Sequence, residues 1–184
     1  MAEPKEYKSE RRHFHISPNK ILIESGSYQG DGIQDALDCG YKRIISFEVF
    51  TDLVEHCRKR FKNNYAVTIV EDTASNMYEH IKSIDEPMTF WLDGHWTGQS
   101  TTKDICCPVL KELNAISLHP IKTHTILVDD VRLFGTEHFG HIQLSDVISK
   151  IKQINPNYSI EFRDGHCKHD VLVAMVKTND VVKS

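Results

Sequence analysis

The stretch Ile21–Gly32, ILIESGSYQGDG, joins an apolar run to a glycine-rich turn. Residues Ile21–Ile23 have the apolar, β-branched character of a buried parallel strand. Gly26, Gly30 and Gly32 allow the chain to turn sharply and bring backbone N–H groups close to a ligand. The pattern predicts a strand followed by a ligand-binding turn and a helix.

The rest of the chain alternates strand-like and helix-like segments, which predicts an α/β fold with a doubly wound, mostly parallel seven-stranded sheet. The expected strands are Ile21–Ile23, Arg43–Phe47, Val67–Val70, Met88–Leu92, His124–Val128, Tyr158–Arg163 and Val171–Val176. The expected helices are Ile33–Cys39, Thr51–Asn63, Ser75–Ile84, Pro108–Ser117 and Leu144–Asn155. Ser145 is a candidate N-cap for the last helix. We expect the last two strands to form an antiparallel hairpin whose turn starts at Asp164-Gly165.

The length and composition of the chain limit the classes of protein to which it can belong. The chain has 184 residues, of which 40% are hydrophobic and 26% charged, and this suits one domain with a real core. We expect a polar N-terminal segment (1–20), a single domain (21–178) and a polar tail (179–184). The short N-terminal segment leaves open whether the chain is part of a larger multidomain enzyme, and a homo-oligomer is a further expectation.

The net charge, the apolar runs and the cysteines indicate which binding partners and which cellular location to expect. The net charge of −4 gives no electrostatic reason to expect nucleic acid, and no apolar run is long enough for a membrane span. The five cysteines are odd in number and lack CxxC spacing. This pattern favours reduced thiols and a cytoplasmic location.

Each expected parallel strand ends near an acid, at the edge of the sheet where ligands bind. These acids are Glu24, Glu48, Asp72, Asp93, and Asp129 with Asp130. Glu48 lies where a carboxylate would accept hydrogen bonds from both hydroxyls of a ribose. The dinucleotide pattern G-x-G-x-x-G does not fit, because Gly26 and Gly30 are too far apart. An acidic loop with Glu24 and Asp31 suits a cationic cofactor and would repel a pyrophosphate.

Residues Glu24–Gly30, ESGSYQG, resemble motif I of the class I S-adenosylmethionine (SAM) methyltransferases. The resemblance extends from Ile21 to about Lys177 and implies that SAM is the cofactor. It implies as cofactor-binding residues Glu24, Gly26, Ser27, Tyr28, Gly30, Glu48, Val49, Asp72, Thr73 and Asp93, with Asp72 and Thr73 near the adenine. The alternatives are a structural glycine turn in another α/β protein and, for Asp72, an ordinary turn or helix-start residue.

Two further apolar runs end in carboxylates, FWLDGH at Phe90–His95 and ILVDD at Ile126–Asp130. In the methyltransferase strand order these strands are neighbours, so Asp93, Asp129 and Asp130 would converge beside the cofactor's methyl group. Three close carboxylates need a cation, and oxygen ligands favour Mg²⁺ or Mn²⁺. The pattern resembles the metal-dependent O-methyltransferases of the catechol and macrocin types. Alternatively, the paired aspartates only cap a turn.

His95 follows the first of these acids, and its imidazole titrates near working pH. We interpret His95 as the base and Asp93 as its catalytic neighbour, in a reaction that deprotonates a hydroxyl. The catechol branch has a lysine just after the metal acid; Trp96 and Thr97 offer none, so the analogy fails at this point. A zinc cluster formed by Gly165–His169 with His138 and His141 is a weaker alternative, because its spacing matches no standard motif.

The loop after His95 is the expected acceptor lid. Trp96 offers a flat apolar face, and Gln99, Thr101 and Arg132 offer polar groups suited to a polyol. The order FWLDGH then VDD resembles sugar O-methyltransferase domains in the glycan-building enzymes of large algal viruses, which implies a sugar acceptor such as rhamnose. The sequence thus favours a metal-dependent SAM O-methyltransferase of glycan modification. The alternative is a SAM-binding fold that has lost catalysis and acts as an interaction or scaffold module of a larger glycan-synthesis enzyme.

Overall fold

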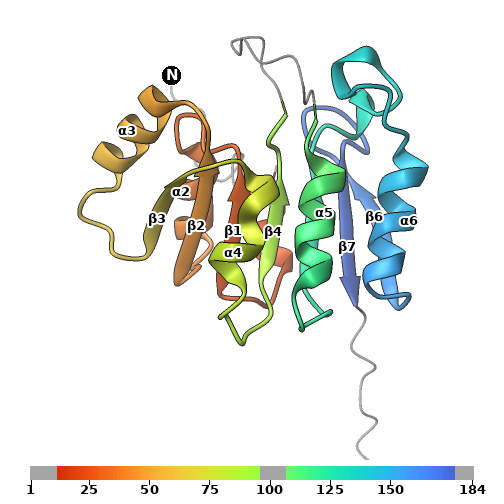
Figure 1. Cartoon of the computed structure of the whole chain (residues 1–184), viewed down its shortest axis with the longest axis horizontal. Coiled ribbons are helices and arrows are strands. Elements are labelled where there is room, and N and C mark those ends of the chain that lie inside the picture. The colour runs from red at the N-terminus through yellow and green to blue at the C-terminus, as the bar shows by residue number, and fades with distance from the viewer. Residues whose placement is uncertain (1–11, 96–106, 177–184) are drawn as a thin grey trace, which may run out of the picture.

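A seven-stranded sheet with the order β3-β2-β1-β4-β5-β7-β6 forms the centre of the protein (Figure 1). The computed structural model describes residues 12–95 and 107–176. The strands are β1 (Ile21–Ser25), β2 (Arg43–Glu48), β3 (Val67–Glu71), β4 (Thr89–Leu92), β5 (Thr125–Val128), β6 (Tyr158–Arg163) and β7 (Val171–Val176). Strands β1–β5 pair in parallel, whereas β7 runs antiparallel between β5 and β6. The predicted doubly wound sheet with its C-terminal hairpin is confirmed.

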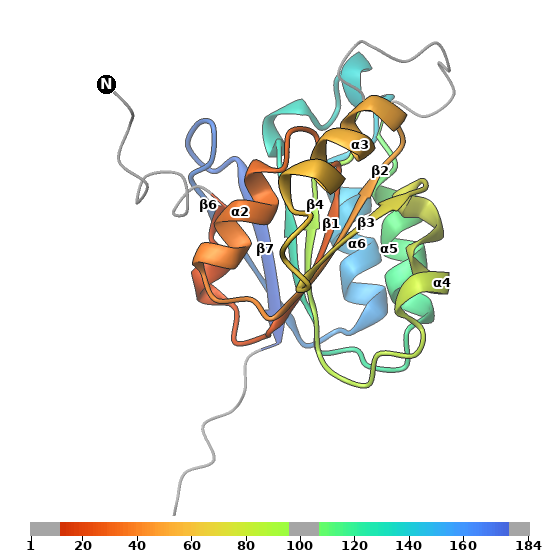
Figure 2. The same cartoon turned by 90° about the vertical axis from the view of Figure 1, so that its left-hand side faces the viewer.

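Helices cover both faces of this sheet (Figure 2). On one face lie α2 (Asp31–Asp38) and α3 (Thr51–Arg60); on the other lie α4 (Met77–Ile81), α5 (Val109–Leu118) and α6 (Leu144–Ile154). Short 3₁₀ turns are η1 (Phe14–Ile16), η2 (Ala74–Asn76), η3 (Val131–Leu133) and η4 (Glu137–Phe139). The connections of a parallel sheet require such crossover helices, which bury the strands on both sides.

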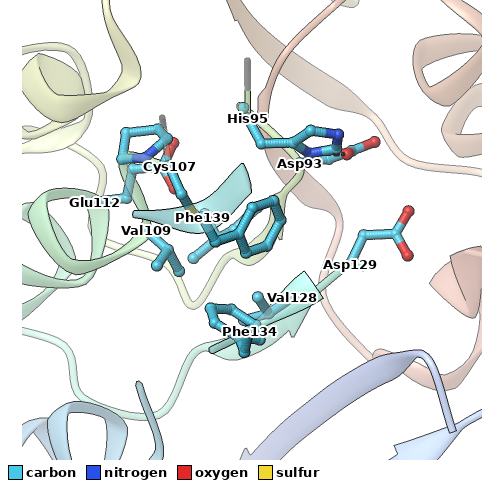
Figure 3. Close-up of a pocket in the computed structure, with 12 residues that line it drawn as sticks. Asp93, His95, Cys107, Val109, Glu112, Val128, Asp129, Phe134 and Phe139 are labelled. Atoms are coloured by element: carbon cyan, nitrogen blue, oxygen red, sulfur yellow. Dashed lines mark ion pairs between the residues drawn. The ribbon is translucent and has the colours of Figure 1, made fainter. Parts of the chain in front are cut away.

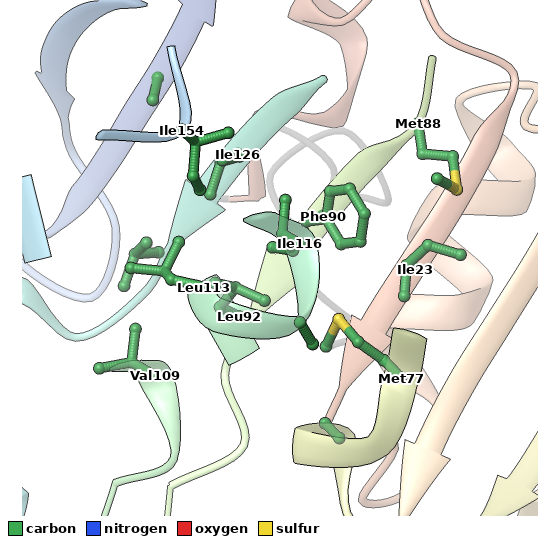
Figure 4. Close-up of a cluster of buried hydrophobic side chains, with 14 of the residues drawn as sticks. Ile23, Met77, Met88, Phe90, Leu92, Val109, Leu113, Ile116, Ile126 and Ile154 are labelled. Atoms are coloured by element: carbon green, nitrogen blue, oxygen red, sulfur yellow. The ribbon is translucent and has the colours of Figure 1, made fainter. Parts of the chain in front are cut away.

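Two apolar cores follow from the alternation of side chains along the strands. In β4, Phe90 and Leu92 face the α4–α6 side, while Trp91 faces the α2–α3 side. Figure 4 shows the larger core, in which Leu113 and Ile116 of α5 pack against the sheet. Because both faces are covered, the strand interiors read as continuous apolar runs, and polar side chains appear where the strands end.

Two local predictions are wrong. The helix expected over Ser75–Ile84 is instead the 3₁₀ turn η2 followed by the short α4, because the Thr73 hydroxyl accepts a hydrogen bond from the Ser75 N–H and starts a tighter turn. Ser145 does not cap α6. Gln143 is the N-cap, and its side chain and that of Asp146 form a reciprocal capping box.

The described end of the polar N-terminal segment packs against the domain. Phe14 is fully buried, with its ring edge-on to Trp91 at 5.4 Å between centroids. The Ser17 hydroxyl hydrogen-bonds Thr89 Oγ1 at 2.6 Å, at the start of β4. Residues 12–20 therefore help to close the edge of the sheet at which the parallel strands begin.

The helices of the described ranges are all short. A membrane-crossing helix needs about 20 predominantly apolar residues. The longest helix here, α6, has 11 residues. Within residues 12–95 and 107–176, no helix is long and apolar enough to span a bilayer.

Two buried histidines join α5 to the start of β5, at the sheet edge opposite the carboxyl ends of the strands. His124 Nδ1 accepts the Met88 N–H at 3.0 Å, so its proton lies on Nε2, which donates to His119 Nδ1 at 3.1 Å. His119 Nε2 in turn donates to the Ile84 carbonyl at 3.0 Å. Burial and the neighbouring His119 and Lys122 lower the pKa of His124 to about 3.

We expect this pair to make the protein less stable in acid. The unfolded chain binds a proton at His124 below pH 6.5, whereas the folded chain does so only near pH 3, so stability falls as pH decreases between these values. The loss from pH 7.5 to pH 5 is about 2 kcal/mol. The free energy of unfolding is measured in urea at pH 7.5 and pH 5, for the wild type and for His124→Gln. The decrease between the two pH values should be about 2 kcal/mol smaller in His124→Gln than in the wild type. An equal decrease in both proteins would show that His124 does not have a lowered pKa.

Candidate functional site

A pocket of about 730 Å³ opens at the carboxyl ends of the parallel strands. This size suits a cofactor or drug-sized ligand. The predicted cofactor-binding residues that line it are Glu24, Gly26, Ser27, Tyr28, Glu48, Val49, Asp72, Thr73 and Asp93. Gly30 does not line the pocket. It is the N-cap of α2, where an added Cβ would lie 2.6 Å from the Phe61 ring.

The glycine turn brings the β1 tip against the β4 tip. Gly26 has φ +83°, and a Cβ there would lie 2.8 Å from the Asp93 carbonyl oxygen, so no larger residue fits without a shift. The N–H groups of Gly26 and Ser27 both donate to the Phe47 carbonyl, at 2.9 and 3.1 Å. The Tyr28 N–H donates to Glu48 Oε2 at 2.9 Å. These N–H groups already bind protein acceptors, which makes the turn a poor receptor for phosphate.

Glu48 ends β2 with its carboxylate facing the pocket, and the residue is 6% exposed. Its Oε1 accepts the N–H groups of Val49 and Phe50, at 2.9 and 3.1 Å, and Oε2 accepts the Tyr28 N–H. A carboxylate has about four acceptor positions. One position on Oε2 therefore remains for a ligand hydroxyl, and a second ribose hydroxyl would have to share an oxygen with a backbone amide.

Glu24 lies deeper in the same wall, 2% exposed, and accepts a hydrogen bond from the Ser46 hydroxyl. Burial raises the pKa of Glu24 to about 8, although the Ser46 hydrogen bond and the charge of Arg12 lower it. A Cβ at position 32 would lie 1.9 Å from Glu24 Oε1, so Gly32 leaves the room that this carboxyl group occupies.

Asp72 and Thr73 line the pocket near the β3 end and also shape the turn after it. Asp72 Oδ1 accepts the Thr73 N–H at 2.7 Å and the Asn76 side-chain amide at 3.0 Å. His80 Nε2 lies 3.5 Å from Asp72 Oδ2. The structure therefore agrees with a turn role for Asp72 and leaves it at the pocket wall as well.

His95 lies between two carboxylates at the other end of the pocket. Its Nδ1 is 3.2 Å from Asp93 Oδ1, and its Nε2 is 3.1 Å from Asp130 Oδ2. Burial lowers the pKa of His95, but the hydrogen bond and charge of Asp93 and the charge of Asp130 outweigh it and raise the pKa above 6.5. The sequence predicted that Asp93, Asp129 and Asp130 converge at the tips of β4 and β5, and in the structure Asp93 and Asp130 both contact His95.

Arg132 and Asp170 extend this cluster. Arg132 forms ion pairs with Asp130, at 2.6 Å, and with Asp170, which is fully buried just before β7. The Arg132 N–H also donates to Asp170 Oδ1 at 3.2 Å. Arg132, predicted to contact the acceptor, thus lines the pocket while its guanidinium binds two carboxylates. Asp170 was missed by sequence reasoning, because it follows a histidine-rich turn and precedes the apolar run Val171–Val176.

The possible metal ligands form two groups of three in the described residues. One group is Asp93, His95 and Asp130, and the other is Asp129, Asp130 and Asp170, each with ligand atoms within 4.8 Å of one another. The predicted set of Asp93, Asp129 and Asp130 is divided between them, with Asp130 in both. Carboxylate oxygens are the donors that Mg²⁺ and Mn²⁺ prefer, so the donor set fits a divalent cation. The histidines of the proposed zinc cluster contribute to neither group.

Glu112 is a second residue that sequence reasoning missed. It lies in the first turn of α5, is 1% exposed, and lines the pocket and a small crevice beside it (Figure 3). Val109, Phe134 and Phe139 supply apolar walls of this crevice. Glutamate is common in amphipathic helices, so the sequence alone does not indicate that Glu112 belongs to a site.

Trp96, Gln99 and Thr101, predicted to bind the acceptor, lie outside the described residues.

The structure resembles solved methyltransferases, although no protein-family model and no curated protein matches the sequence. An O-methyltransferase from Bacillus cereus in complex with S-adenosylhomocysteine (SAH) superposes with a TM-score of 0.64 at 14% identity, covering 96% of this chain and 83% of that one. The fold is that of the class I SAM-dependent methyltransferases.

Other solved structures share this methyltransferase fold. The SAH-bound methyltransferase PaMTH1 of Podospora anserina has a TM-score of 0.58 at 12% identity, covering 97% of this chain and 80% of that one. A candidate rRNA methylase from Clostridium thermocellum has a TM-score of 0.60 at 12% identity, covering 97% and 100%. At such identities the likeness establishes the fold, and the acceptor must be argued from the pocket.

Proposed function

We propose that the protein is a SAM-dependent O-methyltransferase. The observation that carries this proposal is a single pocket with Glu48 at one end and the His95 cluster at the other. The protein-bound N–H groups of the glycine turn favour a cofactor without phosphate, and SAM carries none. The two solved neighbours with bound SAH support the same cofactor.

The cofactor would lie across the carboxyl ends of the strands. In this proposal the adenine lies near Asp72 and Thr73, and the ribose donates a hydroxyl hydrogen bond to Glu48 Oε2. The methyl group then points toward Asp93, His95 and Asp130. The Glu48 carboxylate in the wall of the pocket stabilises the positive charge that SAM carries at its sulfonium and amino groups.

His95 is the proposed base for the acceptor hydroxyl. Asp93 accepts the proton of Nδ1 and so fixes the tautomer in which Nε2 can receive a proton. In the structure Nε2 lies 3.1 Å from Asp130 Oδ2, a contact that requires a proton on Nε2, so His95 must first lose this proton and exchange Asp130 for the acceptor hydroxyl before it can act as the base. Asp130 then remains close to the imidazolium that forms and stabilises it.

A divalent cation is part of the proposal, held by Asp93, Asp129 and Asp130. When bound there, Mg²⁺ or Mn²⁺ would lower the pKa of the acceptor hydroxyl. Arg132 already places a positive charge on Asp130 and Asp170, so a cation must share Asp130 with this guanidinium. A sugar acceptor, with rhamnose as the first candidate, rests on the sequence of the loop after His95.

The experiment that tests this function combines binding with turnover. Titration of SAH into the protein should give micromolar binding, and methyl transfer from labelled SAM should be detected in a panel of sugars that includes rhamnose. Removal of divalent cations by EDTA should abolish transfer, and Mg²⁺ or Mn²⁺ should restore it. Absence of SAH binding would refute the methyltransferase assignment. Binding without transfer to any acceptor would favour the non-catalytic scaffold module.

A further inference from the structure

The Glu112 carboxylate is buried in the pocket wall with one oxygen unsatisfied. Its Oε1 has no hydrogen-bond partner among the described residues, although the side chain is almost fully enclosed. A buried acceptor without a partner costs about 1–3 kcal/mol, and more when it is charged. Native proteins rarely keep such a group unless a ligand or water completes it.

The other contacts of Glu112 place it at the meeting point of two strand tips. The Ser25 hydroxyl lies close enough to the Glu112 carboxylate to lower its pKa, and the same Ser25 oxygen accepts the Asp93 N–H at 3.0 Å. A Cβ on Gly94 would lie 3.1 Å from Glu112 Oε1. Ser25 ends β1 and Gly94 follows β4, and these strands are neighbours at the centre of the sheet. Glu112 is thus held against the backbone of the turn that carries His95.

This position lies between the two ends of the pocket described above. Glu48 belongs to β2, on one side of β1, and Asp130 follows β5, on the other side of β4. A ligand that reaches from Glu48 to His95 must cross the tips of β1 and β4, where Glu112 lies. In SAM and SAH, the part that extends from the sulfur away from the adenosine is the amino-acid tail, and the only cation on this tail is an α-ammonium group.

Charge supports an ammonium as the missing partner. Burial raises the pKa of Glu112 to about 7, and the Ser25 hydrogen bond only partly offsets this. Glu24, the other deeply buried glutamate of the pocket, differs because the Ser46 hydroxyl donates a hydrogen bond to it. An ammonium group would supply Glu112 with both the missing hydrogen bond and the missing charge.

We propose that Glu112 is a binding residue for the α-ammonium group of the cofactor. This inference rests on the proposed function and assigns to α5 a contact with the amino-acid tail. The geometry makes one strong claim: Glu112 distinguishes ligands that carry the ammonium group from ligands that share only the adenosine part.

Two probes that differ in the tail test this claim. SAH carries the ammonium group, whereas 5′-methylthioadenosine has the same adenosine and thioether without the amino-acid tail. Calorimetric titration of both probes into the wild type and Glu112→Gln should show SAH binding weakened about 10- to 100-fold, because a charge-assisted hydrogen bond is lost. Binding of 5′-methylthioadenosine should change by less than about twofold.

The controls separate this inference from the proposed function. Glu137→Gln makes the same change of charge at an exposed position on η4 and should leave both affinities unaltered. If Glu112→Gln does not fold, as judged by its melting curve, Glu112→Met serves as an apolar variant of similar length with the same expectation. An equal loss for both probes, or no loss for either, would overturn the role of Glu112 while leaving the methyltransferase assignment intact. Failure of the wild type to bind either probe would overturn both.

Discussion

Glu48→Ala is expected to weaken SAH binding by at least about 100-fold. The substitution removes the acceptor position on Oε2 that faces the pocket. It also leaves the N–H groups of Tyr28, Val49 and Phe50 without their acceptor. Each hydrogen bond to a charged group contributes about 1.5–3 kcal/mol. Without the Glu48 carboxylate, the loops that contain Tyr28 and Val49 also lose the contact that holds them in place at the pocket.

Calorimetric titration of SAH measures this effect, and the neighbouring strand offers a matched control. Glu71 is the direct register partner of Glu48 on β3, but it is exposed and does not line the pocket. Glu71→Ala should therefore bind SAH as the wild type does. The melting temperatures of both variants are recorded to separate a binding defect from unfolding. Equal SAH affinity in Glu48→Ala and the wild type would show that the ribose is not held at β2.

Asp130→Asn is expected to reduce methyl transfer by at least about 100-fold while changing SAH affinity only a few-fold. Asp130 contacts His95 on one oxygen and Arg132 on the other. An amide keeps the shape but removes the charge that stabilises the imidazolium and binds the cation. The backbone of Asp130 has φ +57°, which asparagine tolerates well, so the variant should retain the turn.

Initial rates of transfer from labelled SAM measure this effect once an acceptor has been found. Asp38→Asn, a change of the same kind at an exposed position of α2, provides the control and should be fully active. Comparable rates in Asp130→Asn and the wild type would exclude Asp130 from the reaction and leave the carboxylate cluster with a structural role.

The strand tips could be predicted from the sequence because their pattern is local. A buried parallel strand reads as an apolar run, and the acid that ends it marks the exposed edge, so Glu48 and Asp93 follow from a few neighbouring residues. The hairpin Tyr158–Arg163 and Val171–Val176 was predicted with its exact bounds for the same reason.

The remaining site residues depend on contacts between distant segments. Asp170 reaches the site only because β7 lies beside β5, and Glu112 only because α5 packs under the tips of β1 and β4. His95 could be predicted as a base from its place after β4, but the contacts of both its nitrogens with carboxylates depend on the β5 tip and could not. The predicted N-cap of α6 was also wrong. Gln143 and Asp146 form a capping box at the start of this helix, so Ser145 is not its N-cap.

The order of the strands also governs how the protein can fold. Residues 21–71 build β1, β2 and β3, and residues 89–176 build the other four strands, so within the described chain the two halves of the sheet meet at the ladder from Leu22–Thr89 to Ser25–Leu92. This pairing joins segments 67 residues apart in sequence, so we expect it to form late in folding, because closing a long loop costs chain entropy. The pocket has walls from both halves, so it exists only after they have joined. A bound ligand therefore stabilises the complete sheet against global unfolding and offers nothing to a half-folded chain.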